Sequence, residues 1–131
     1  DAVWISHEHG DHYMGMDELF AYKRNRPREE FTPIPVYMTP ETWEIVSPRF
    51  AYLEQMEVIE PRKVRPFQWF SRGEFDILLF DTEHGAFAKG STGCLIRSDD
   101  GQGNEKRIVY TSDFMELPRV PSEALGFNSF R

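Results

Sequence analysis

One segment, residues 7–12, constrains this chain more than any other part of its sequence. The segment reads His-Glu-His-Gly-Asp-His, and it directly follows the short apolar run at residues 2–6. A short apolar run that ends in a polar loop is typical of a buried strand. Loops that follow strands are where α/β proteins carry their functional side chains. The sequence therefore predicts a ligand-binding loop at the end of a strand.

The residue types in this loop are those that bind transition metals. Imidazole nitrogens and carboxylate oxygens are natural ligands of Zn²⁺ and similar ions. In an extended segment His7 and His9 point the same way, so both reach one metal ion. Asp11 and His12 lie beyond Gly10, where the backbone can turn, and they can face a second ion close to the first. A purification tag is a plain run of histidines, so the interleaved acids and glycine favour a binuclear metal site over an accidental cluster.

Two later residues extend the expected ligand set. His84 is the last of the four histidines and follows the apolar run at residues 75–80. Asp113 follows another expected strand at residues 107–110. Both therefore come just after a strand, like the first cluster. We expect His84 to be a third ligand of the first metal ion and Asp113 to bridge the two ions.

The order of the expected elements indicates the fold class. Helices are expected from residue 16 to a stop at Pro27, and from residues 39–41 to a break or restart at Ser47-Pro48. Strands are expected at residues 2–6, 35–38, 58–60, 67–70, 75–80, 92–96 and 107–110. Strands and helices alternate first and strands follow, which is typical of a layered α/β domain with its helices outside.

These motifs together resemble the metallo-β-lactamase superfamily. The resemblance rests on H-x-H-x-D-H at residues 7–12, His84-Gly85, and Ser112-Asp113, each after a strand. Further segments are similar to the branch that holds the cyclic-phosphate phosphodiesterase of phosphonate breakdown and the tRNA 3′-end-processing endonuclease: residues 12–19, 34–37, 91–96 and 110–113. The resemblance covers nearly the whole chain.

The resemblance implies a fold and a ligand set. The fold is a four-layer αββα sandwich of roughly twice this length. Residues 1–131 are therefore expected to be one partial domain, without the family's N- and C-terminal portions and without its last second-metal histidine. The implied ligands are His7, His9 and His84 for the first ion, Asp11 and His12 for the second, and Asp113 as the bridge.

The implied activity is that of a binuclear metallo-hydrolase. We expect a phosphodiesterase that cleaves a small phosphodiester by a hydroxide bridging two Zn²⁺ ions, with Asp11 also orienting the nucleophile. Mn²⁺ or Fe²⁺ are alternative metals. Other open alternatives are a lactone or thioester hydrolase, a mononuclear iron dioxygenase and a degenerate metal-binding domain. His9 argues against a diiron oxygen-reducing relative, which would carry a carboxylate there.

Composition narrows the expected partners. The net charge of −7 disfavours a nucleic-acid partner, without excluding one, and leaves a small molecule as the expected substrate. No apolar run approaches the roughly 20 residues that span a bilayer, so no membrane partner is expected. The single cysteine, Cys94, fits a reducing, cytoplasmic setting and is expected to be a buried core residue. The oligomeric state stays open.

Several side chains have two interpretations. Glu8 and Glu83, which flank expected ligands, are more often solvated than engaged in orienting an imidazole. Ser112 has the same two interpretations: a solvated side chain, or one that helps to orient an imidazole. Trp69 is expected in the core. The basic residues 23–28 are expected to form a solvated helix end, with contact to a phosphate as the alternative.

Overall fold

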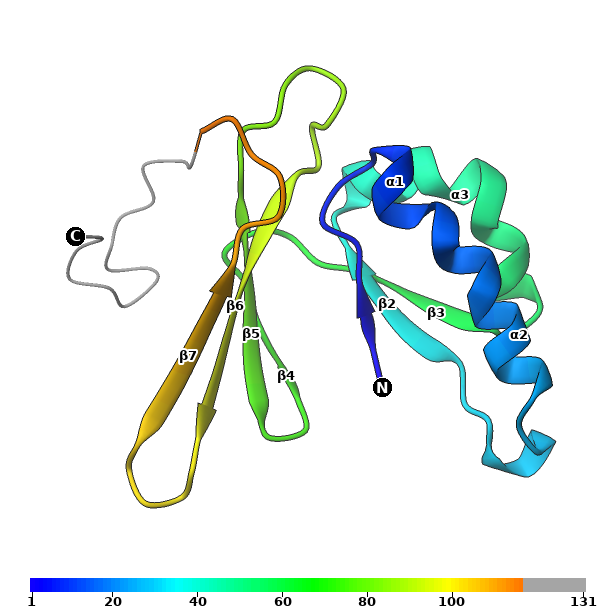
Figure 1. Cartoon of the computed structure of the whole chain (residues 1–131), viewed down its shortest axis with the longest axis horizontal. Helices are drawn as coiled ribbons and strands as arrows, with labels where there is room; N and C mark the ends of the chain where they lie inside the picture. The colour runs from blue at the N-terminus through cyan, green and yellow to red at the C-terminus, as the bar shows by residue number, and fades with distance from the viewer. Residues whose placement is uncertain (117–131) are drawn as a thin grey trace.

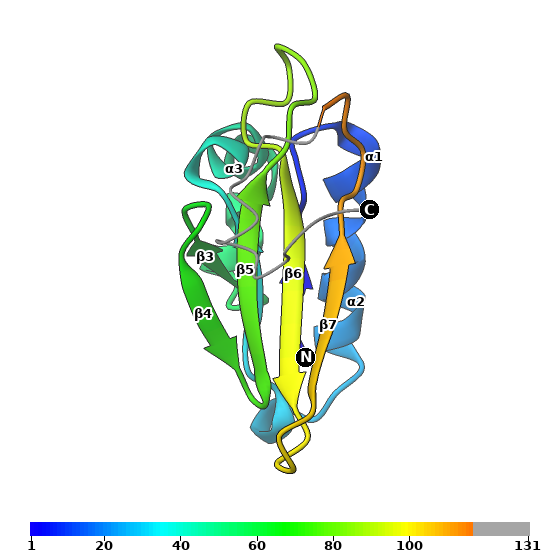
Figure 2. The ribbon, with the colours of Figure 1, turned by 90° about the vertical axis from the view of Figure 1, so that its left-hand side faces the viewer.

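Three layers stack in the order helices, three-stranded sheet and four-stranded sheet (Figure 1). The computed structural model describes residues 1–116. The parallel sheet has the order β1-β2-β3, with β1 Val3–Trp4, β2 Ile34–Met38 and β3 Ile59–Lys63. The antiparallel sheet holds β4 Trp69–Arg72, β5 Phe75–Asp81, β6 Thr92–Asp99 and β7 Glu105–Tyr110 in chain order (Figure 2). The expected α/β layering is confirmed; residues 1–116 supply an αββ part of the sandwich, without a second helical layer.

The helical layer covers one face of the parallel sheet (Figure 1). It consists of α1 Gly10–Tyr13, the 3₁₀ turn η1 Met14–Asp17, α2 Glu18–Arg24, the 3₁₀ turn η2 Arg28–Glu30 and α3 Pro40–Gln55. Apolar side chains from these helices and the sheet form the main core: Ile5, Met16, Val36, Met38, Val46, Phe50, Leu53, Val58 and Ile59. None of the helices in residues 1–116 is long and apolar enough to cross a membrane.

The predicted break of α3 at Ser47-Pro48 is wrong, because the helix continues to Gln55. Pro48 has no N–H to donate to the carbonyl of Glu44, four residues earlier. Both residues are exposed, so water can replace the lost donor. The buried side chains of Val46 and Phe50 hold the helix on the core at either side of the proline.

Other boundaries differ from the expected ones where local backbone geometry decides. The turn 7–12 is already helical from Gly10. Strand β4 starts at Trp69, not at Phe67, because Phe67 has a left-handed φ of 63° and its N–H donates to the carbonyl of Leu79 (2.8 Å). Its hairpin with β5 turns at Gly73, whose φ is +59°. Strands β3, β6 and β7 extend beyond the expected residues.

The two sheets contact each other through few but specific groups. The ring of Tyr37 on β2 stacks on that of Phe70 on β4, with centroids 4.6 Å apart. The backbone N–H of Thr92 donates to the carbonyl of Ser6 (2.8 Å), which joins the end of β1 to the start of β6. Cys94 is buried on β6, as expected. Trp69 is not in the core: its side chain is 41% exposed, and the Arg97 guanidinium lies over its ring.

Candidate metal centre

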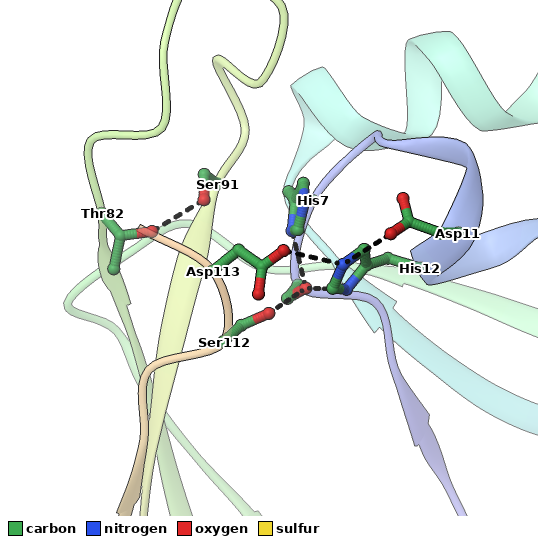
Figure 3. A network of polar contacts seen from close by, with 8 residues as sticks. His7, Asp11, His12, Thr82, Ser91, Ser112 and Asp113 are labelled. Carbon is green, nitrogen blue, oxygen red and sulfur yellow. Dashed lines mark hydrogen bonds and ion pairs between the residues drawn. The ribbon is translucent and has the colours of Figure 1, made fainter. Parts of the chain in front are cut away.

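Three connecting segments meet at one end of the sandwich, at the top of Figure 1. They are residues 5–9 after β1, residues 82–91 between β5 and β6, and residues 111–113 after β7. The middle segment is closed at its base by a hydrogen bond between Thr82 Oγ1 and Ser91 Oγ (2.7 Å; Figure 3). Every residue expected to bind metal lies on one of these segments or on α1, which begins directly after the first of them.

The first group of converging ligands holds three histidines. His7, His9 and His84 each offer a ring nitrogen, and these atoms lie within 4.8 Å of one another. Ring centroids are 4.7 Å apart for His7 and His9, and 4.8 Å apart for His9 and His84. The structure thus brings together residues 77 positions apart in sequence, the three that the sequence assigned to one ion.

The second group shares a member with the first. His7, His12 and Asp113 also place ligand atoms within 4.8 Å of one another. Asp113 Oδ2 lies 3.2 Å from His12 Nε2 (Figure 3). Asp11 belongs to neither group: its side chain is 80% exposed, and its Oδ2 lies 3.6 Å from His12 Nε2. The structure therefore places Asp11 beside the second group and Asp113 within it.

The bonding of His7 fits a metal ligand. The ring is fully buried, and its Nδ1 pairs with Ser6 Oγ at 2.9 Å. Its Nε2 is buried without a hydrogen-bond partner among residues 1–116, and so is Nδ1 of His84. An unpaired buried polar atom costs about 1–3 kcal/mol. A cation held by these nitrogens would remove that cost, so the residues present fit a bound metal ion.

Electrostatics favour the neutral form of this imidazole. Burial, followed by the neighbouring His12, His9 and His84, lowers the pKa of His7 to about 4, against a smaller opposing effect of Asp113. A histidine must be unprotonated to bind metal. His7 is therefore available as a ligand throughout the neutral and mildly acid range.

Two serines join the ligand-bearing segments. Ser112 Oγ donates to Ser6 Oγ (2.9 Å), and Ser6 Oγ also lies 3.5 Å from His12 Nδ1 (Figure 3). Ser112 has a left-handed φ of 57°, and its side chain reaches the first segment. The sequence left the role of Ser112 open, and Ser6 was missed; its place directly before His7 was the available signal. Through Ser6, both serines orient the imidazole of His7.

Glu8 is buried rather than solvated, so that expectation is wrong. Its carboxylate accepts hydrogen bonds from the Gly90 N–H (3.0 Å to Oε1) and from the Thr42 hydroxyl (3.2 Å). Thr42 lies in the first turn of α3, and Gly90 lies in the segment that carries His84. Glu8 is therefore a link between the two segments that supply the first group, and within residues 1–116 its carboxylate forms no hydrogen bond with an imidazole.

The site of this link has no room for a larger residue at position 90. A Cβ added to Gly90 would lie 2.4 Å from both Thr39 Oγ1 and Thr42 Oγ1. Thr39 also caps α3 by accepting from the Thr42 N–H (3.2 Å), so neither threonine is free to move. Close approach of the His84-bearing segment to the start of α3 thus depends on glycine.

Comparison with known proteins agrees with this fold. The family model described as the beta-lactamase superfamily domain matches residues 1–127. No curated protein sequence matches the chain significantly. Among solved structures, the metallo-beta-lactamase fold protein YhfI from Bacillus subtilis is 26% identical, with a TM-score of 0.59; the match covers 86% of this chain and 41% of YhfI.

A second solved structure shares the fold at lower identity. Zn²⁺-bound PqqB from Methylobacterium extorquens is 19% identical, with a TM-score of 0.65, and the match covers 90% of this chain and 40% of PqqB. The chain thus spans less than half the length of either of these structures.

Proposed function

Since the chain belongs to the beta-lactamase superfamily, we propose that it supplies most of the metal-binding residues of a binuclear metal-dependent hydrolase. One observation carries the proposal. His7 Nε2 is buried without a partner among residues 1–116, and His7 is the member shared by two groups of converging ligands. Two groups of converging ligands that share a residue place two candidate cation sites next to each other, as a two-metal hydrolase requires.

The ligand roles follow from this placement. His7, His9 and His84 would hold one ion, His12 would hold the second, and Asp113 would be a ligand that serves both. Asp11 is proposed as a further ligand of the second ion, which requires its exposed side chain to rotate toward His12. Zn²⁺ is the proposed metal, because three imidazoles in one group suit zinc and because PqqB binds it.

The proposed substrate is a small phosphodiester, supported by the resemblance of the sequence to the phosphodiesterase branch of the superfamily. Two bound cations would supply an activated water and positive charge for the reacting oxygens. Asp11 is also proposed to orient that water through its carboxylate, whose side chain is 80% exposed. All four histidines lie in the two groups, so the acid for the leaving group is not a histidine of this chain.

Turnover by the protein, freed of metal and reloaded with zinc or manganese, tests this function. We expect cleavage of bis-p-nitrophenyl phosphate that is lost in His9→Ala. Cleavage of a lactone or thioester instead would keep the metal site and reject the phosphodiester. A single bound iron with no hydrolysis would reject the hydrolase. Unchanged metal binding and turnover in His9→Ala would reject the site itself.

A further inference from the structure

We propose that a second site, remote from the histidines, binds a nucleoside monophosphate or a similarly built aromatic phosphomonoester. The site is a hollow of about 650 Å³ at the C-terminal end of α2, lined by the end of that helix, by η2 and by the turn after α3. This end of α2 points away from α1 and the histidine-bearing segments (Figure 1). Its volume is within the range of about 300–1,000 Å³ typical of small-molecule sites.

The charge of the hollow selects an anion. Arg24, Arg26 and Arg28 all line it, although the chain as a whole carries a net charge of −7. Within residues 1–116 neither Arg24 nor Arg28 has a carboxylate partner. Arg26 lies over the ring of Tyr22, with its guanidinium carbon 4.0 Å from the ring centroid. Guanidinium groups bind phosphate through paired N–H donors, so this wall suits a phosphate dianion.

Two further charged residues of the lining, Lys23 and Glu57, do not favour a phosphate. Lys23 Nζ donates to the backbone carbonyls of Met56 (2.6 Å) and Glu57 (3.1 Å), which ties α2 to the end of α3 and occupies that ammonium group. Glu57 also lines the hollow and would repel an anion on the α3 side. The phosphate is therefore assigned to Arg24, Arg26 and Arg28.

The remaining lining is apolar, which selects the rest of the ligand. Phe20, Phe31, Pro33 and Met56 also line the hollow. An inorganic anion would leave this surface uncovered, whereas an aromatic ring of the ligand can stack on it. Phosphate on the arginines and a planar ring on the phenylalanines together give the proposed ligand class.

Calorimetric titration of AMP into the whole chain, with a chelator present to keep the histidine groups metal-free, tests the proposal independently of the proposed hydrolase. The double variant Arg24→Ala/Arg28→Ala should weaken AMP binding about 100-fold, at about tenfold for each guanidinium that no longer binds the phosphate. The double variant Arg49→Ala/Arg62→Ala removes the same charge from exposed positions on α3 and β3 and is the matched control. It should change the affinity by less than about twofold, because distant exposed charges are screened.

Further outcomes test the site itself, its aromatic part and the class of its ligand. Absence of saturable AMP binding, or equal weakening in the two double variants, would reject the site. Inorganic phosphate binding as tightly as AMP would reject the aromatic subsite. Tighter binding of a single-stranded oligonucleotide than of AMP at the same salt would reject a small-molecule ligand in favour of nucleic acid. Loss of the AMP signal in Phe31→Ala, with thermal unfolding unchanged, would support the aromatic subsite.

Discussion

The same tripeptide, Glu-His-Gly, occurs twice in this chain and has different roles in its two places. In residues 8–10 it follows the inner parallel sheet, and in residues 83–85 it lies on the connection between β5 and β6. The two histidines face each other, with ring centroids 4.8 Å apart. The glutamates differ: one is buried and bonded to two other segments, whereas the other is exposed and accepts from the N–H of Gly85 in its own segment.

The glycines differ as well, and the cause is position in the layers. Gly10 is the first residue of α1, whereas Gly85 has a left-handed φ of +87°. Glu8 is covered by the segment that carries the second copy, so its carboxylate must find partners within the protein. Glu83, on that covering segment, is exposed to water. Local sequence therefore specifies the metal-binding chemistry of both copies, while layer position decides what the flanking residues do.

The largest expected effect is on Zn²⁺ binding, and it tests whether His9 and His84 are equivalent ligands. His9→Ala and His84→Ala should each weaken Zn²⁺ binding by more than about 100-fold, because loss of a residue that merely supports a ligand already costs about 10–100-fold. Competition with a chromogenic chelator measures this, with Glu83→Ala as the control. A loss in only one of the two variants would show that the histidines do not share an ion.

The glutamates should differ in stability. Glu8→Ala leaves the Gly90 N–H and the Thr42 hydroxyl without their acceptor and should lower the free energy of unfolding by about 2–3 kcal/mol. Glu83→Ala, at an exposed position, should change it by less than about 0.5 kcal/mol. Urea denaturation of both variants gives the two values. Similar losses of unfolding free energy in the two variants would mean that burial does not distinguish Glu8 from Glu83.

The glycines should differ by a smaller amount. Gly85→Ala requires a left-handed conformation and should cost about 1–2 kcal/mol. In Gly10→Ala the new Cβ meets Met14 Cγ at 3.5 Å, an ordinary contact, so this variant should be neutral or slightly stabilising. Thermal unfolding of the metal-free variants distinguishes them. Equal destabilisation would imply that Gly10 also has a conformational role.

The smallest expected effect near neutral pH is that of His7 on the stability of the metal-free protein. Its pKa is about 4 in the folded chain and 6.5 as an unperturbed value, so the unfolded chain binds the extra proton between these limits. Metal-free stability should therefore be unaffected by this group above about pH 6.5 and decrease as the pH falls toward 4. Denaturation curves at several pH values should show this dependence in the wild type and a weaker one in His7→Phe. An equal dependence in both would assign it to other groups.

Much of the fold and of the metal chemistry was predictable from sequence, since both depend on local patterns. The apolar run before His7 and the strand before His84 predicted where each histidine would lie. The predictions that were wrong concern features that depend on long-range contacts. The burial of Glu8 follows from Gly90, 82 residues away, and the continuity of α3 past Pro48 follows from the core beneath it.

The most direct test of the central claim is the amount of zinc bound per chain at equilibrium, compared between the wild type and a variant in which both His9 and His84 are replaced by alanine. The account predicts tight zinc binding by the wild type and loss of the tightest site in the variant, with both proteins folded. Zinc binding that is absent from the wild type, or unchanged in the variant, would contradict the convergence of the two Glu-His-Gly segments on a metal centre.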